Sequence, residues 1–304
     1  EEVVVTVSHE GYIKRVPLTE YKSQGRGGKG TRAMDTKDAD FVSQMYVVNA
    51  HAHLLFLTDK GKAYLKKVYE IPESSRAARG RAIVNFVEME AGDRMKAVVP
   101  IREFVEDGFL LTCTKGGTVK RTALSAYANI RSTGIIGVAI EEGDELLTAG
   151  IVTEKQDVLI GTATGMSIRF SVEDVRPTGR DSRGVKGIEL REGDRVVGMG
   201  VIVDVETQQV LAVSANGYGK RTPVGEWRQQ NRGGIGIIAI DASERNGDLV
   251  KLSLVRPEDQ VMVITDGGQI IRTRVSEIRE AGRNTQRPMP RISATRVRIS
   301  TPPV

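Results

Sequence analysis

Cysteine and long apolar runs are nearly missing from this sequence. Cys113 is the only cysteine in 304 residues, which excludes a disulfide within the chain and predicts a reducing compartment. No apolar run has the length of a membrane span and no signal peptide is visible, so a cytoplasmic location is expected. The chain begins without methionine, which indicates a fragment of a longer protein.

Aromatic residues are also scarce, at 5% of the chain, and Trp227 is the only tryptophan. Glycine is abundant, with 33 residues, and valine and isoleucine are common, a composition that favours β-strands and tight turns. The net charge of +5 is consistent with an anionic partner. Because 39 acidic residues accompany it, any basic surface must be local.

One short pattern recurs six times: an apolar run, Ser or Thr, two residues, Gly, three residues and Arg. The second copy has Leu65 at the last position, followed by two lysines. Each copy predicts a β-hairpin whose turn needs a glycine with positive φ. The glycines lie 48 to 56 residues apart, at Gly11, Gly61, Gly117, Gly165, Gly217 and Gly268. Six hairpins at this spacing predict a repeat architecture.

Each repeat also contains a glycine-rich loop about 20 residues after the hairpin glycine, followed by an apolar strand. Four repeats then end in a Gly-Asp turn, at Asp93, Asp144, Asp194 and Asp248. Repeats of about 50 residues with four short strands are typical of propeller blades. The Gly-His and Trp-Asp signature of the commonest propeller repeat is missing, as are the blade aromatics of the kelch type. The sequence therefore predicts an all-β, propeller-like fold of six blades.

The polar residues that keep the phase of the hairpin repeat are basic. They are Lys14, Arg15, Lys66, Lys67, Lys120, Arg121, Arg169, Lys220, Arg221 and Arg272. Adjacent strand residues point to opposite faces, so at most one member of each adjacent pair faces the same way. Taken singly, each pair is typical of a solvated strand face. Because equivalent positions in a radial array lie on one ring, together they predict a curved positive track.

The first glycine-rich loop, Gln24-Gly25-Arg26-Gly27-Gly28-Lys29-Gly30, holds two cations on a permissive backbone that can approach phosphates. It is not a P-loop, because Lys29 precedes Gly30 rather than Ser or Thr, and Ser23 stands where the first glycine belongs. Reduced versions of the loop follow in the other repeats. Their candidate phosphate-binding cations are Arg79, Arg81, Arg183, Lys186, Arg232 and Arg283.

These residues resemble the C-terminal domain of the A subunit of bacterial DNA gyrase. The hallmark of that family is the gyrase A box, Gln-Arg/Lys-Arg-Gly-Gly-Arg/Lys-Gly, which Gln24–Gly30 matches except at Gly25, where the family has a cation. The resemblance extends from Val3 to about Gln286. It implies a six-bladed β-pinwheel, with strands exchanged between neighbouring blades.

The resemblance further implies that the domain wraps double-stranded DNA around a basic rim with one handedness and so supports negative supercoiling. The implied partners are the N-terminal part of gyrase A and the whole of gyrase B, in a nucleoid-associated cytoplasmic enzyme, with no membrane partner and with the isolated domain monomeric. Neither a catalytic residue nor a metal or cofactor site is expected in this chain. In the family, ATP and Mg²⁺ act in other parts of the full enzyme, a type II topoisomerase.

The domain is expected to span residues 1–286. The predicted blades cover roughly 3–52, 53–104, 105–155, 156–207, 208–258 and 259–286. Residues 287–304 are expected to form a basic tail outside the blades, because Pro288 and Pro290 lie where a closing strand belongs and two nearby prolines interrupt a ladder.

Three other functions stay open. The first is the related C-terminal domain of topoisomerase IV, which binds DNA but lacks a full box. The second is a protein-binding propeller, which would show no salt-dependent DNA affinity. The third is an enzyme, for which His51 and His53 could be imagined as metal ligands, although no matching Cys, His or carboxylate partners are apparent.

Overall fold

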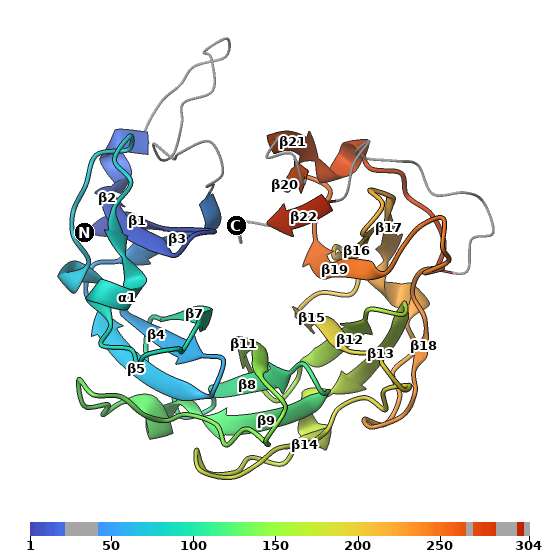
Figure 1. The fold of residues 1–304 in the computed structure, drawn as a ribbon, viewed down its shortest axis with the longest axis horizontal. Helices are drawn as coiled ribbons and strands as arrows, with labels where there is room; N and C mark the ends of the chain where they lie inside the picture. Colours follow the sequence, from blue (N-terminus) through green and yellow to red (C-terminus); the bar gives the residue numbers. More distant parts are fainter. Residues whose placement is uncertain (22–41, 266–269, 284–296, 301–304) are drawn as a thin grey trace.

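Six antiparallel sheets, counted over the residues that the structure describes, stand around a common centre like the blades of a propeller (Figure 1). The structure is a computed structural model and describes residues 1–21, 42–265, 270–283 and 297–300. The predicted all-β propeller-like class is therefore confirmed.

The middle of each blade is the predicted hairpin. Its first strands are β1 (Glu2–Ser8), β4 (His53–Thr58), β8 (Phe109–Thr114), β12 (Asp157–Thr162), β16 (Gln209–Ser214) and β20 (Gln260–Thr265). Its second strands are β2 (Tyr12–Pro17), β5 (Lys62–Lys67), β9 (Thr118–Ala123), β13 (Met166–Ser171), β17 (Gly219–Pro223) and β21 (Ile270–Arg274). The described hairpin glycines have positive φ, as Gly165 does at 91°. A Cβ on Gly165 would also lie 2.3 Å from the carbonyl oxygen of Ile240, so both the backbone angle and the close approach require glycine.

Each blade has, on the side of the centre, an inner strand that pairs with the first hairpin strand. These inner strands are β3 (Val42–Asn49), β7 (Met95–Ile101), β11 (Leu146–Val152), β15 (Val196–Ile202), β19 (Leu249–Val255) and β22 (Val297–Ser300). Strand β22 pairs with β20, so residues 297–300 belong to the sixth sheet. The expectation that all of 287–304 lies outside the blades is corrected at this strand, which supplies the inner partner that β20 would otherwise lack.

Four blades carry a short outermost strand that comes from the following repeat. These strands are β6 (Arg81–Ala82), β10 (Ile135–Ile136), β14 (Val185–Lys186) and β18 (Ile237–Ile238). In sequence β14 follows the hairpin of blade 4, yet it pairs with β9 of blade 3. The strand exchange implied by the family resemblance is thus present between described blades, and it leaves the sheets with four or three described strands.

Short helical turns connect the hairpins to the loops that follow. They are η1 (Leu18–Tyr21), η2 (Val68–Glu70), η3 (Leu124–Tyr127), η4 (Val172–Asp174), η5 (Val224–Glu226) and η6 (Val275–Glu277), with a single α-helical turn, α1 (Ile83–Phe86), after β6. Within the described ranges, no helix is long and apolar enough to cross a membrane.

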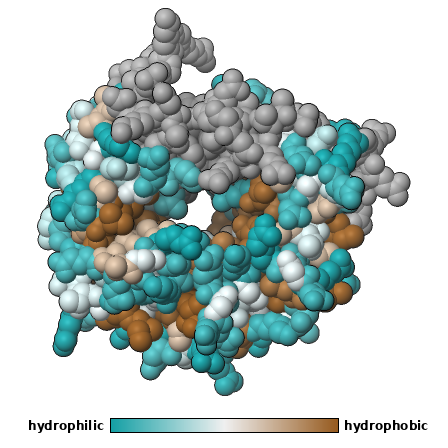
Figure 2. Space-filling view, viewed as in Figure 1, coloured by the Kyte–Doolittle hydropathy of each residue, from teal (hydrophilic) through white to brown (hydrophobic). Residues whose placement is uncertain are grey.

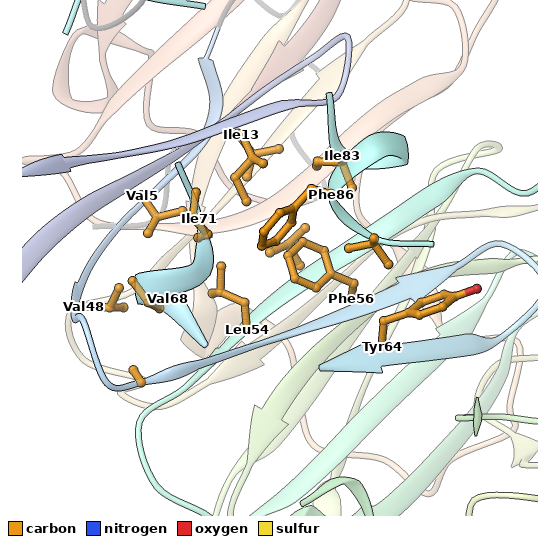
Figure 3. Close-up of a cluster of buried hydrophobic side chains, with 14 of the residues drawn as sticks. Val5, Ile13, Val48, Leu54, Phe56, Tyr64, Val68, Ile71, Ile83 and Phe86 are labelled. Atoms are coloured by element: carbon orange, nitrogen blue, oxygen red, sulfur yellow. The ribbon is translucent and has the colours of Figure 1, made fainter. Parts of the chain in front are cut away.

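The hydrophobic core lies between neighbouring sheets rather than in one central mass. Between blades 1 and 2, Val5, Ile13, Leu54 and Phe56 are fully buried, and the ring of Phe86 meets that of Phe56 edge-on (Figure 3). Similar clusters lie between each following pair of described sheets. Because burial of one such side chain stabilises the fold by about 1.5–3 kcal/mol, each blade depends on its neighbour.

Candidate nucleic-acid interface

The outer circumference of the disc is formed by the loops that end in the exchanged strands (Figure 1). We call them the rim loops: residues 71–82, 128–136, 175–186, 227–238 and 278–283, the last as far as it is described. A close backbone approach fixes each loop against the preceding blade. A Cβ on Gly184, for example, would lie 2.2 Å from the carbonyl oxygen of Val119, so only glycine allows β14 to reach β9.

Cations predicted from the sequence lie exposed on two of these loops. Arg81 is exposed and donates to the carbonyl oxygen of Asn85 at 2.7 Å. The side chain of Arg183 is 70% exposed, and that of Lys186 is 57% exposed and pairs with Glu189. Surface ion pairs of this kind are weak, so Arg183 and Lys186 can exchange a carboxylate for a phosphate.

Arg79 and Arg232 lie on rim loops but are held more firmly. The guanidinium of Arg79 stacks 3.7 Å from the centroid of the Tyr12 ring and binds Glu10 at 2.6 Å. Arg232 donates to the carbonyl oxygens of Asp174 and Lys186 at 2.9 and 3.0 Å. Each arginine therefore joins its loop to the preceding blade and has less freedom to meet a ligand than Arg81 or Arg183.

Arg283 repeats the arrangement of Arg232 one blade later. It donates to the carbonyl oxygen of Ile238 at 2.8 Å, and Arg180 donates to that of Ile136 at 3.1 Å. Each acceptor belongs to the exchanged strand of the preceding repeat. Arginines therefore join the four consecutive rim loops from 128–136 to 278–283 end to end.

Three hairpin lysines predicted as DNA contacts are buried instead. Lys14 is 0% exposed, and Lys120 and Lys220 are each 2% exposed. Their ammonium groups donate to backbone carbonyls of the next repeat. The expectation that they form part of an exposed positive track is wrong, because the exchanged rim loop covers the strand face that would otherwise meet solvent.

Arg121 is also buried, at 4% exposure, with its guanidinium 4.6 Å from the centroid of the Phe109 ring. The prediction of a surface cation is therefore wrong there as well. Burial lowers the pKa of Arg121. Its backbone forms a parallel bridge with Pro177 of the next repeat, which covers it.

The hairpin arginines Arg15, Arg169 and Arg221 face the next rim loop and are largely covered. The side chain of Arg169 is 14% exposed, binds Asp157 at 2.7 Å and donates to the carbonyl oxygen of Trp227 at 2.9 Å. Arg15 and Arg221 bind the equivalent carbonyls of Ile71 and Ile278. These arginines brace joints between blades and present little charge to a ligand.

Lys66 and Lys67 are half-buried. The ammonium of Lys66 lies 5.5 Å from the centroid of the Phe86 ring, and that of Lys67 donates to the carbonyl oxygen of His51 at 3.2 Å. Arg272 lies in β21, but its side chain is outside the described residues, as is the whole predicted box, Gln24–Gly30, with Arg26 and Lys29. Their assignments stay predictions.

Sequence reasoning missed several exposed rim cations. Arg176, Arg228 and Arg279 each follow the buried residue that begins a rim loop, namely Val175, Trp227 and Ile278, and Arg131 lies on the rim loop of blade 3. The available signal was the position that Arg176, Arg228 and Arg279 share, directly after an apolar residue at the same point of the repeat. They extend the exposed charge to the loops of blades 3, 5 and 6.

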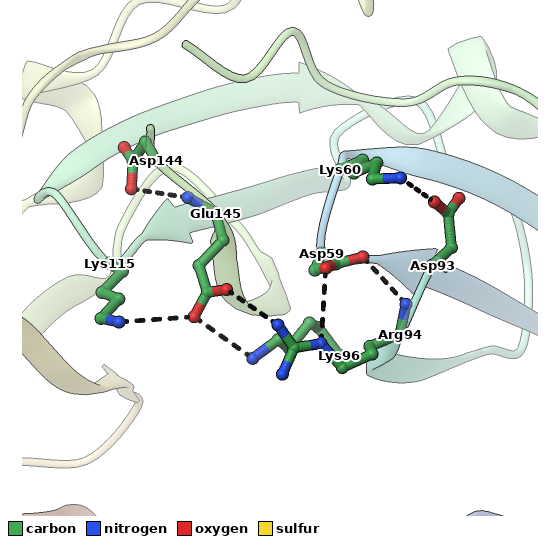
Figure 4. Close-up of polar contacts among 8 residues, drawn as sticks. All are labelled: Asp59, Lys60, Asp93, Arg94, Lys96, Lys115, Asp144 and Glu145. Carbon is green, nitrogen blue, oxygen red and sulfur yellow. Dashed lines mark hydrogen bonds and ion pairs between the residues drawn. The ribbon is translucent and has the colours of Figure 1, made fainter. Parts of the chain in front are cut away.

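The turns beside the inner strands carry carboxylates, and these carboxylates pair with the basic side chains nearby. The carboxylate of Glu145 lies 3.5 Å from the ammonium of Lys96, 3.7 Å from that of Lys115 and 3.9 Å from the guanidinium of Arg94 (Figure 4). Asp59 accepts from the backbone N–H of Arg94 at 2.9 Å. The predicted turn aspartates act similarly, as Asp144 Oδ1 accepts from two backbone N–H groups.

Hydrophilic residues cover much of the face seen in Figure 2, with apolar side chains showing between them. In the described part of the chain, no cluster of His, Cys, Asp and Glu is arranged to hold a metal ion. His51 and His53 instead make edge-on contacts with the rings of Tyr69 and Phe104, at 6.0 and 5.1 Å between centroids. The charged feature that stands out is the basic rim.

A disc of antiparallel blades that exchange strands and gather cations on their outer loops is a basic-rimmed β-propeller. The profile of the family described as "DNA gyrase C-terminal domain, beta-propeller" matches residues 2–49, 52–102, 108–153, 156–202, 208–256 and 259–286. The chain belongs to this family.

Curated relatives agree with this assignment. The DNA gyrase A subunit of Staphylococcus epidermidis is 45% identical over 287 residues, and that of Staphylococcus aureus is 44% identical over the same length. Each alignment covers 94% of this chain and 32% of the relative, so the chain spans about a third of the length of these proteins.

Two solved structures share the fold. "Structure of DNA gyrase A C-terminal domain" aligns with a TM-score of 0.76 and 26% identity, over 99% of this chain and 100% of the other. "Crystal structure of the C-terminal domain of DNA topoisomerase IV" aligns with a TM-score of 0.79 and 25% identity, over 93% and 86%.

Proposed function

We propose that this domain binds duplex DNA without reading its sequence and wraps it with one handedness around the rim loops. The observation that carries the proposal is the ring of exposed rim cations, among them Arg81, Arg183 and Lys186. Arg and Lys contacts with phosphates release counterions and hold a duplex in position without base specificity. The family membership and the gyrase relatives support the same function.

Bending is the main cost of wrapping. A smooth bend of 40–90° over 20–30 base pairs costs about 1–6 kcal/mol, so several blades must contribute contacts at once. The rim loops of neighbouring blades are joined by Arg180, Arg232 and Arg283, and a curved band that is already fixed loses little entropy when DNA binds. The band thus favours bent over straight duplex.

In the complete protein, the domain would act beside the N-terminal part of gyrase A and beside gyrase B. Wrapping would present a second segment of the same DNA to the cleavage site and bias strand passage toward negative supercoils. Cleavage, ATP hydrolysis and Mg²⁺ binding would take place outside this chain, and the domain alone would have no enzymatic activity. The box cations Arg26 and Lys29 would add contacts that favour wrapping.

A plasmid-closure assay tests the proposal. Nicked circular DNA is sealed by ligase with increasing amounts of the domain, and linking number is read after deproteinisation. A protein-dependent shift to positive linking difference is expected, and it should weaken as salt rises. Salt-sensitive binding with no shift would contradict wrapping and would favour the topoisomerase IV type, whose domain shares this fold with a TM-score of 0.79. No binding at low salt would favour a protein-binding propeller.

A further inference from the structure

The third residue after the hairpin glycine alternates in chemistry from blade to blade. It is lysine in blades 1, 3 and 5, at Lys14, Lys120 and Lys220, and apolar or aromatic in blades 2 and 4, at Tyr64 and Ile168. All five side chains are at most 2% exposed. One buried position thus holds a charge in every second blade, which random placement of surface lysines does not produce.

Lys120 shows what this charge contacts. Its ammonium donates to the carbonyl oxygens of Gly179 at 2.8 Å and Ser182 at 3.0 Å, and also to that of Arg180. An ammonium has three N–H donors, and all three acceptors come from the rim loop of the next blade. The geometry satisfies a buried charge completely, which is the condition for its burial to be tolerated.

The same contacts recur two blades earlier and two blades later. Lys14 donates to the carbonyl oxygens of Ser75, Arg76 and Ala78, at 3.0, 2.5 and 2.9 Å. Lys220 donates to those of Gly282 and Arg283, at 3.0 and 2.7 Å. In each case the acceptors begin four residues after the buried aliphatic residue that starts the rim loop, which is Ile71, Val175 or Ile278.

At the other described joints between blades, the side chain that forms the hydrogen bond is an aromatic residue at the start of the rim loop, and no lysine takes part. The rim loop of blade 3 follows Tyr127, whose hydroxyl donates to the carbonyl oxygen of Gly137 at 2.8 Å. The rim loop of blade 5 begins at Trp227, whose Nε1 donates to Ser167 Oγ at 2.7 Å. The described joints are therefore of two alternating kinds, which we call lysine joints and aromatic joints.

The lysine joints lie directly behind exposed rim cations. The loop that Lys120 holds carries Arg176, Arg183 and Lys186, and the loop that Lys14 holds carries Arg81. Arg180, whose own carbonyl accepts from Lys120, reaches across to the carbonyl oxygen of Ile136 on the preceding exchanged strand. The ammonium therefore fixes the backbone from which these cations project.

We propose that Lys14, Lys120 and Lys220 are positioning residues for DNA wrapping, each holding the rim loop of the next blade in the curved form that lets its cations meet bent DNA together. This inference rests on the proposed wrapping function. In this role the hairpin lysines lie behind the DNA interface rather than in it. Their loss would therefore weaken wrapping more than simple binding. A loop that is released keeps its cations but no longer holds them along a common curve.

The test uses the whole 304-residue chain with the substitution Lys120→Met and the matched control Ile168→Met, which changes the equivalent buried position of the next blade. The Lys120 joint is first observed in the unchanged protein, by ¹⁵N-lysine NMR near pH 6. Three slowly exchanging ammonium signals are expected from the caged lysines, and Lys120→Met should remove one. If the unchanged protein shows no protected ammonium signals, the lysine joints do not exist in solution and the proposal is overturned, whether or not the variant folds.

Wrapping and binding are then measured separately. Lys120→Met should lower the linking-number shift per bound protein at least about twofold. The reason is that the cations of a released loop no longer offset the free energy of bending the duplex. Its affinity for a duplex too short to wrap should change less than about threefold, since the phosphate contacts of the other blades remain. Hydrogen exchange should accelerate at residues 176–186 and not at 228–236, and Ile168→Met should leave all three measurements unchanged.

Two results would contradict the proposal: an unchanged linking-number shift in Lys120→Met, or equal losses of wrapping and of short-duplex binding. If the unchanged domain itself gives no linking-number shift, the proposed wrapping function fails. The lysine joints are then judged on the ammonium signals and loop exchange alone, so the two failures can be told apart.

Discussion

The indole Nε1 of Trp227 donates to Ser167 Oγ at 2.7 Å, across the joint between the fourth and fifth blades. Ser167 in turn donates to the carbonyl oxygen of Ile237 on the exchanged strand β18. The chain's only tryptophan is thus fixed to β13 and, through one hydroxyl, to the strand that its own repeat lends to the preceding blade. The contact reports directly on this joint.

Ser167→Ala should therefore destabilise the domain. The substitution leaves the buried indole N–H without an acceptor, which costs about 1–3 kcal/mol. Urea unfolding followed by tryptophan fluorescence measures the loss, and Ser276→Ala, at an exposed serine of η6, is the control. An unfolding midpoint equal to that of the unchanged protein would show that this hydrogen bond does not stabilise the joint.

Removing rim cations should weaken DNA binding in a salt-dependent way. We expect Arg183→Ala with Lys186→Ala to reduce the slope of log affinity against log salt by about one for each phosphate interaction that is removed. The comparison is Arg169→Ala, which removes a covered arginine, 14% exposed, and should act on stability rather than on the slope. Equal slopes for both variants and the unchanged protein would remove these two cations from the interface.

The box cations should matter more for wrapping than for binding. Replacing Arg26 and Lys29 with Ala should abolish the linking-number shift and leave much of the affinity for short duplexes, because the rim of the other blades is unchanged. The reverse substitution at the divergent position, Gly25→Arg, restores the family pattern and should increase the shift. Equal loss of wrapping and binding, or loss of neither, would argue against a special role for the box.

Stability should depend on pH through the buried lysines. Burial lowers the pKa values of Lys14, Lys120 and Lys220 to about 8, from an ordinary 10.5. Above pH 8 the unfolded chain therefore binds more protons than the folded one, and these lysines make the free energy of unfolding rise with pH. Below pH 8 both states are protonated and the contribution is constant.

The measurement compares urea unfolding of the unchanged protein and of Lys120→Met at pH 7, 8 and 9. The unchanged protein should gain stability relative to the variant between pH 8 and 9. The range stops there because burial raises the pKa of the Cys113 thiol to about 12 and that of Tyr127 to about 12, which lowers stability at higher pH. A constant difference between the two proteins would mean that Lys120 titrates as an exposed lysine.

The sequence alone was enough to predict the hairpins and the propeller-like class. Gly11, Gly61, Gly117, Gly165 and Gly217 all adopt positive φ, because the turn leaves no alternative and the requirement is local. The exchanged strands could be predicted only from the family resemblance. Two-residue strands such as β14 have no periodicity of their own, and their partners lie in another repeat.

The site was predicted only in part, and Lys120 shows why. Strand alternation gives the face on which a side chain lies, but not whether a later repeat covers that face. Lys120 aligns with Tyr64 and Ile168, and this alignment of a lysine with apolar residues was the signal that the position is buried. The exposed cations Arg183 and Lys186 were found because they share a glycine-rich loop whose composition keeps it at the surface.

The alternation of lysine and aromatic joints bears on how such a ring can grow during evolution. If one repeat were duplicated or deleted, a joint would combine a buried lysine with a loop that starts with an aromatic residue, or an apolar residue with a loop whose carbonyls need a lysine. Two adjacent repeats can be gained or lost together with the described joints still matched. The alternation therefore predicts that blade number changes in steps of two.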